Sequence, residues 1–115
     1  MDSAPVTVVE TPEFLTAVRK LMDEDERMSL VDHLARNPRS GDIIPGTGGV
    51  RKLRWALEGR GKRGGTRVIY FYHNEALPLF VFTAYAKSAQ GDLSKEAQNR
   101  LRQAAKLMVE RYGKE

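Results

Sequence analysis

The chain has no cysteine among its 115 residues and only two histidines. The absence of cysteine excludes disulfide scaffolds, thiolate metal sites and cysteine nucleophiles. No apolar run approaches the roughly 20 residues that a membrane-spanning helix requires. The first residues show no basic start followed by an apolar stretch, so we expect no secretory signal and a cytoplasmic protein without a membrane partner.

The length of the chain fits one domain with a single core. Hydrophobic residues make up 41% of the sequence, which is enough to fold, and charged residues make up 30%. The sequence contains no internal repeat and no linker-like segment. We therefore predict a single domain over residues 1–115.

The net charge of +4 is distributed unevenly along the chain. Residues 41–70 contain seven basic and two acidic side chains, whereas the rest of the chain contains twelve basic and thirteen acidic ones. The whole positive excess therefore lies in one short block. A concentrated basic block on a neutral body is typical of a protein that binds a polyanion, although a solvated basic surface without a ligand gives the same pattern.

Two helices are predicted in the first third of the chain. The β-branched run at 5–9 predicts a first strand. Thr11 and Pro12 form a typical helix start, because threonine caps and proline suits the first helical position. The acidic run at 23–26 interrupts the apolar spacing, and Pro38 ends a second helix.

The middle of the chain predicts a loop and three strands. Residues 37–49 are rich in glycine and proline, and we expect a loop there. Strands are predicted at 50–57, 66–72 and 77–85, and their short connections favour an antiparallel meander. With a final amphipathic helix over 94–112, the expected fold is an α+β domain in the order β-α-α-β-β-β-α. Its sheet is mainly antiparallel, with two N-terminal helices and a C-terminal helix packed on it.

No familiar cofactor or metal motif is present. The glycine-rich segment 59–65 has the spacing of a dinucleotide-binding fingerprint, but it opens a strand rather than a helix. We expect it to be a basic hairpin tip that approaches a phosphate backbone. His33 and His73 are not at metal-ligand spacing, so we expect no metal and no cofactor.

Alternation in the predicted strands places basic side chains on one face. Lys52 and Arg54 point the same way, because side chains in a strand repeat every two residues. Arg67 lies in the next strand, and Lys87 directly follows the third. If these strands pair at about 4.8 Å, the four cations converge on one patch. Arginine clamps phosphate and a crowded lysine is a possible base, so the patch suits either phosphodiester cleavage or plain RNA binding.

Three segments together resemble the HigB-type branch of the RelE/ParE toxin superfamily. They are GDIIPGTGGVRKLRW at 41–55, GRGKRGGTRVIY at 59–70 and YAK at 85–87, and the likeness is densest over 41–94. The resemblance implies a RelE-like fold and a toxin of a type II toxin–antitoxin system. Such toxins are small basic endoribonucleases that enter the ribosomal A site and cut translated mRNA, which inhibits translation. The implied partners are the 30S A site with its mRNA and a HigA-like antitoxin with a helix-turn-helix domain.

The resemblance also implies roles for individual residues. Four basic residues match the family's catalytic positions, and Arg67 among them is expected to contact the scissile phosphate. A second set is expected to bind RNA or the ribosome. The catalytic set is Lys52, Arg54, Arg67 and Lys87, and the binding set is Arg51, Arg60, Lys62, Arg63 and Tyr85.

The sequence departs from the RelE pattern at two places. Ser88 stands where RelE has a further arginine, and Leu93 or Ser94 stands where RelE uses a tyrosine. The assignment of Lys52 as base and Arg67 as phosphate stabiliser is therefore a hypothesis. ParE-like inhibition of DNA gyrase and RNA binding without catalysis are the alternatives. The dense basic strands argue against the first, because such inhibition would not need a phosphate-directed patch, and they leave the second open.

Overall fold

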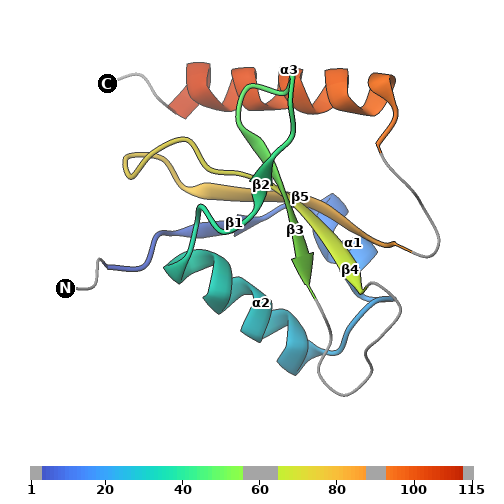
Figure 1. Ribbon diagram of the computed structural model, residues 1–115. Coiled ribbons are helices and arrows are strands. Elements are labelled where there is room, and N and C mark those ends of the chain that lie inside the picture. The colour runs from blue at the N-terminus through green and yellow to red at the C-terminus, as the bar shows by residue number, and fades with distance from the viewer. Residues whose placement is uncertain (1–3, 56–64, 88–92, 113–115) are drawn as a thin grey trace.

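A computed structural model describes residues 4–55, 65–87 and 93–112. Three helices and one five-stranded sheet make up these residues. In chain order they are β1 (Val8–Glu10), α1 (Pro12–Val18), α2 (Glu24–Arg36), β2 (Asp42–Ile43), β3 (Val50–Trp55), β4 (Thr66–Phe71), β5 (Leu79–Ala86) and α3 (Lys95–Tyr112). Helix α3 covers one face of the sheet, and α1 and α2 lie on the other (Figure 1).

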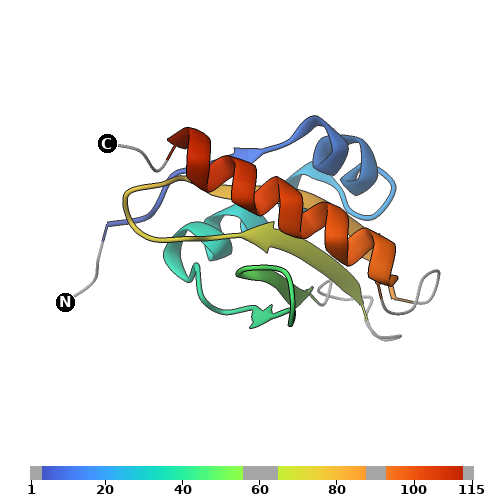
Figure 2. The same ribbon diagram turned by 90° about the horizontal axis from the view of Figure 1, so that it is seen from above.

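The strand order in the sheet is β1-β5-β4-β3-β2. Strands β3, β4 and β5 form an antiparallel meander, and β1 pairs with β5 in parallel. The predicted α+β fold with a mainly antiparallel sheet is confirmed. Figure 2 shows the same arrangement from above, with α3 crossing in front of the sheet.

The predicted loop over 37–49 is wrong at two residues. Asp42 and Ile43 form β2, which pairs antiparallel with Lys52 and Arg51 of β3. A two-residue strand is too short to show any periodicity, so the sequence pattern could not reveal it. The other strands differ from prediction at their ends, and the predicted end of β3 at 56–57 lies outside the described residues.

All three helices begin at capping residues. The Thr11 side chain accepts a hydrogen bond from the Phe14 N–H at 3.2 Å. The Asp23 carboxylate accepts from the Glu26 N–H at 2.9 Å, so the acidic run forms the first turn of α2 and favours the positive end of its dipole. The Ser94 hydroxyl accepts a hydrogen bond from the Ala97 N–H, in the first turn of α3, at 3.1 Å. The predicted caps Thr11 and Ser94 are thus confirmed.

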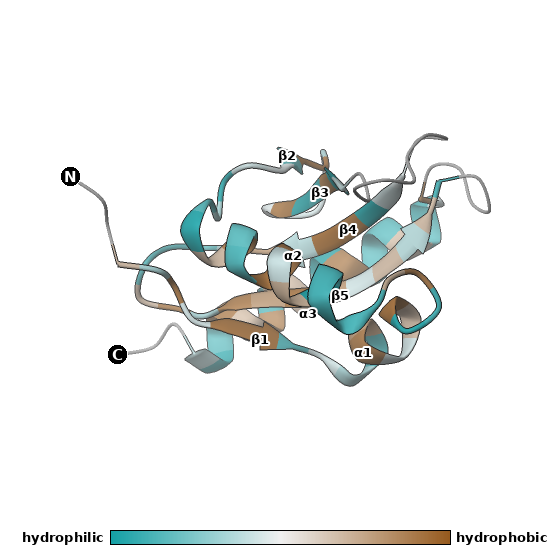
Figure 3. Ribbon diagram, turned by 90° about the horizontal axis from the view of Figure 1, so that it is seen from below, coloured by the Kyte–Doolittle hydropathy of each residue, from teal (hydrophilic) through white to brown (hydrophobic). Residues whose placement is uncertain are grey.

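The sheet buries apolar side chains on both faces. Beneath α1 and α2 the core includes Phe14, Leu30 and Leu34, and beneath α3 it includes Ile69 and Phe71. Figure 3 shows hydrophobic residues concentrated in the strands and hydrophilic ones along the near side of α2. Every residue of β4 is buried, because this strand lies between both cores.

A buried tyrosine fastens the start of β2 to the middle of the sheet. The Tyr70 hydroxyl accepts a hydrogen bond from the Gly41 N–H at 2.8 Å and donates one to the Pro38 carbonyl, also at 2.8 Å. A Cβ atom at Gly41 would lie 2.9 Å from the tyrosine ring, so only glycine fits there. Burial raises the pKa of the Tyr70 phenol above its usual value.

Within the described ranges, no helix has the length and hydropathy needed to cross a membrane.

Replacing Tyr70 with phenylalanine should lower the free energy of unfolding by about 1–3 kcal/mol, because the buried Gly41 N–H loses its acceptor. Urea unfolding followed by circular dichroism measures the change. Tyr112→Phe is the matched control, because Tyr112 is 53% exposed. Equal unfolding midpoints for the two variants would contradict the role given to the Tyr70 hydroxyl.

Candidate functional site

The register of the meander aligns three polar side chains in one row. Arg54 of β3 lies directly opposite Arg67 of β4, and Arg67 lies directly opposite Tyr85 of β5. Directly opposed residues in a sheet project from the same face. Ile69, two residues along β4 from Arg67, packs in the core beneath α3, so the row lies on the α3 face.

The other two predicted catalytic residues extend this row. Lys52 lies opposite Ile69 and so also projects from the α3 face. Lys87 follows Tyr85 by two residues, and its backbone N–H donates to the Gly65 carbonyl at 3.2 Å, so the pairing of β5 continues to this point. The structure therefore places Lys52, Arg54 and Arg67 on one face of the sheet, and Lys87 directly follows β5 at the end of that face. We call Lys52, Arg54, Arg67, Lys87 and Tyr85 the cation face.

A bulge in β5 puts Tyr85 and Lys87 on this face. Between the pairs Ile69–Thr83 and Tyr70–Val81, β5 contains one extra residue. Simple alternation from the buried Phe80 would send Tyr85 and Lys87 to the α1–α2 side. The extra residue reverses the alternation, as β-bulges do, and turns both side chains toward the cation face.

The residues of the cation face differ in exposure. Arg54 and Lys87 are exposed, Lys52 is half-buried, and Arg67 is only 7% exposed. Arg54 and Arg67 are like charges directly opposite each other in the sheet, and such charges repel. Among the described strand residues, the α3 face of β2 to β5 carries one carboxylate, that of Asp42, which lies opposite Lys52.

The predicted binding residues are distributed differently. Arg51 lies on the opposite face from Lys52 and Arg54, and its Nη1 donates to the carbonyls of Arg39 at 3.2 Å and Gly41 at 2.8 Å. These bonds secure the start of β2 against β3, and an RNA-binding role for Arg51 stays a prediction. The predicted loop cations lie outside the described residues, and they are Arg60, Lys62 and Arg63.

The positions at which the sequence departs from the RelE pattern are Ser88, Leu93 and Ser94, and the structure describes two of them. Ser88 lies outside the described residues. Leu93 packs against the core beneath α3, and Ser94 caps that helix. Neither of the two described positions supplies an ionisable side chain to the cation face.

The histidines lie away from this face or at its far end. His33 is on α2, where its Nε2 lies 3.1 Å from the Ser40 Oγ and its ring centroid is 5.4 Å from that of Trp55. The His73 ring stacks on Phe71, and His73 lies beyond the end of β4 that is farther from Arg67. Within the described part of the chain, no group of three or more histidine, aspartate or glutamate side chains could hold a metal ion.

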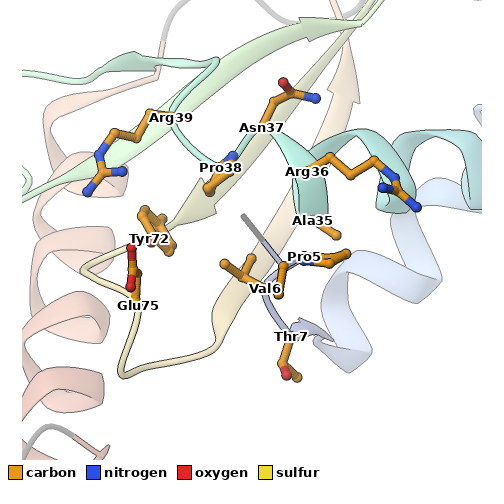
Figure 4. Close-up of a pocket in the computed structure, with 11 residues that line it drawn as sticks. Pro5, Val6, Thr7, Ala35, Arg36, Asn37, Pro38, Arg39, Tyr72 and Glu75 are labelled. Atoms are coloured by element: carbon orange, nitrogen blue, oxygen red, sulfur yellow. The ribbon is translucent and has the colours of Figure 1, made fainter. Parts of the chain in front are cut away.

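A polar pocket of about 770 Å³ lies at the C-terminal end of α2 (Figure 4). It is lined by the N-terminal segment, the end of α2 and the β4–β5 connection, and the Arg39 guanidinium lies 5.1 Å from the centre of the Tyr72 ring there. Sequence reasoning did not single out this pocket. None of the predicted site residues lines it.

Comparison with known proteins identifies the family of this chain. Residues 10–115 match the family model described as the RelE toxin of the RelE/RelB toxin–antitoxin system. The chain belongs to the RelE toxin family. Among solved structures, the free E. coli toxin RelE with two arginine-to-alanine substitutions matches with a TM-score of 0.58 at 20% identity, covering 84% of this chain and 98% of that one. At this identity the match shows a shared fold, and family membership implies a cognate antitoxin as partner.

Replacing Arg54 of this RelE-family toxin with glutamine should raise the free energy of unfolding by about 0.2–1 kcal/mol at low salt, because it removes the repulsion from Arg67. The gain should shrink in about 1 M salt, where exposed charges are screened. Urea unfolding at both salt concentrations measures it. Arg36→Gln is the control, because it breaks the exposed ion pair with Asp32 and should not stabilise the protein. A loss of stability in Arg54→Gln would contradict the repulsion.

Proposed function

We propose that this RelE-family toxin is a HigB-type, ribosome-dependent endoribonuclease that binds in the A site and cleaves translated mRNA. The observation that carries the proposal is the row formed by Arg54, Arg67 and Tyr85, with Lys52 and Lys87 on the same face. A phosphate placed on this row would meet charge-assisted donors from neighbouring strands. The aromatic ring of Tyr85 at the end of the row suits contact with an unstacked RNA base.

The proposed reaction cleaves a phosphodiester by attack of the neighbouring ribose 2′-oxygen. A bond forms between this oxygen and phosphorus, and the bond from phosphorus to the 5′-oxygen breaks. The products are a 2′,3′-cyclic phosphate and a 5′-hydroxyl. The 2′-hydroxyl must lose a proton, the negative charge of the phosphorane must be stabilised, and the leaving oxygen must gain a proton.

Each cation has a place in this scheme. Arg67 binds the non-bridging oxygens, because a guanidinium matches phosphate with two parallel hydrogen bonds. Lys52, as a free amine, takes the proton of the 2′-hydroxyl. Arg54 holds part of the negative charge, and the Lys87 ammonium gives a proton to the leaving 5′-oxygen. The proposed steps use lysine and arginine side chains, without a metal ion.

The partners follow from this activity. The substrate is mRNA in the 30S A site, which places the protein in the cytoplasm. We further propose a HigA-like antitoxin with a helix-turn-helix domain. A small helix-turn-helix protein encoded beside this chain would support that partner.

Arg67→Ala should reduce mRNA cleavage by about 100-fold or more, as removal of one donor to a transition-state oxyanion does. The rate is measured in a reconstituted translation reaction with purified protein. Because Arg67 is buried, thermal unfolding of the variant must be followed in parallel, and Arg67→Lys provides a second variant that keeps the charge. Arg36→Gln is the control and should cleave at the normal rate. Full cleavage by a folded Arg67→Ala variant would contradict the assignment.

Primer extension on mRNA from cells that express the protein separates the alternatives. We expect cuts at codon boundaries that require translation, and no cut next to a nucleotide that lacks its 2′-hydroxyl in the reconstituted reaction. DNA breaks that depend on gyrase would instead support a ParE-like inhibitor. The absence of both mRNA cuts and DNA breaks would support an RNA-binding protein without catalysis.

A further inference from the structure

Helix α3 carries a charge pattern that the proposed function does not use. The helix contains five basic residues and two acidic ones. The basic residues are Lys95, Arg100, Arg102, Lys106 and Arg111, and the acidic residues are Glu96 and Glu110. All seven are exposed.

The packing of α3 shows which flank of the helix faces which part of the sheet. A groove of about 540 Å³ separates α3 from α1 and β5, and Ala97, Arg100 and Ala104 line it from the helix. The opposite flank therefore faces β3, with which α3 is in contact. Val109 on this flank packs against the core that contains Val50 of β3. Figure 2 shows α1 on one side of α3 and β3 on the other.

Helical geometry divides the charges between the two flanks. At 3.6 residues per turn, Lys95, Arg102 and Lys106 fall within about 40° of one another on the flank that faces β3. Glu96 lies outside this sector, whereas Glu110 lies one turn after Lys106, at the edge of the sector, and lines the same hollow as Arg102 and Lys106. Arg100 and Arg111 lie on the groove flank. The β3-facing flank is thus a line of three cations on the side of α3 that faces the strand carrying Lys52 and Arg54.

These three cations have no carboxylate partner among the described residues. The ion pairs in the described part of the chain join Arg27 to Glu10 and Glu24, and Arg36 to Asp32, all on the α2 side. The side chain of Arg102 contacts only a neutral partner, the Asn99 amide oxygen at 3.4 Å. Among the described residues, the arginines of α2 are thus paired with carboxylates, whereas Lys95, Arg102 and Lys106 have no carboxylate partner that would compete with another anion.

We propose that Lys95, Arg102 and Lys106 form the second wall of the mRNA channel and bind phosphates of the strand that the cation face cleaves. This inference rests on the proposed function. The sheet supplies the floor of the channel, and α3 supplies one side. Lys95 and Arg102 are about 10 Å apart along the helix axis, and Arg102 and Lys106 are about 6 Å apart, so they would contact several consecutive nucleotides. Their contribution is to binding and not to the chemical step.

The double variant Arg102→Gln with Lys106→Gln tests this wall, and Arg100→Gln with Arg111→Gln is its matched control. Both lose two positive charges from the same helix, but the control loses them from the other flank. The dissociation constant is measured on ribosomes whose mRNA carries a 2′-O-methyl group at the cleaved nucleotide. We expect the first variant to bind at least about tenfold more weakly, with a salt slope lower by about 2, and the control to bind normally. The maximal single-turnover rate at saturating ribosomes should stay normal in both.

A second arm shows which RNA is bound. Neutral methylphosphonates in the mRNA beside the scissile phosphate should weaken binding of the wild type but not weaken the wall variant further. The wall variant could instead bind more weakly than the wild type by the same factor on the normal and on the methylphosphonate mRNA. That result would place the contact on ribosomal RNA and overturn the proposal. Equal effects of the two double variants, or loss of antitoxin binding alone, would also overturn it. Failure of the wild type to cut any translated mRNA would instead refute the proposed function itself.

Discussion

The pairing register of β3, β4 and β5 is the constraint on which the site depends. A shift of one residue would turn every side chain of a strand to the other face. In β4 such a shift would exchange Arg67 with the buried Thr66 or Val68, and it would separate Ile69 and Phe71 from their core beneath α3. Because both faces of β4 are buried, packing holds this register strongly. The same packing that stabilises the sheet therefore sets Arg67 between Arg54 and Tyr85.

The bulge in β5 shows how the fold aims a side chain without moving a strand. The strand must place Phe80 and Phe82 under α3, and it must also place Tyr85 on that face. Two-residue alternation alone cannot satisfy both requirements, because 82 and 85 differ by an odd number. One extra residue satisfies both. The bulge thus connects the apolar half of the sheet with the cation face.

Much of the fold could be predicted from the sequence, and the reasons are physical. Thr11 and Ser94 are local caps, and Lys52 and Arg54 are two residues apart in one strand, so short-range rules place them. The strand β2 could not be predicted, because its two residues are defined only by their partner. The positions of Arg51 and of the α3 flank also depend on which faces pack together. Those contacts join residues far apart in the chain, which a single sequence does not reveal.

The central claim is that the cation face holds the scissile phosphate of an mRNA. A structure of the toxin on a ribosome, with mRNA that carries a 2′-O-methyl group at the cleaved nucleotide, tests it most directly. The account predicts that the phosphate next to this nucleotide lies over the row of Arg54, Arg67 and Tyr85. It would be contradicted if the mRNA passed over α2 or the pocket near Tyr72 while that row faced no nucleic acid.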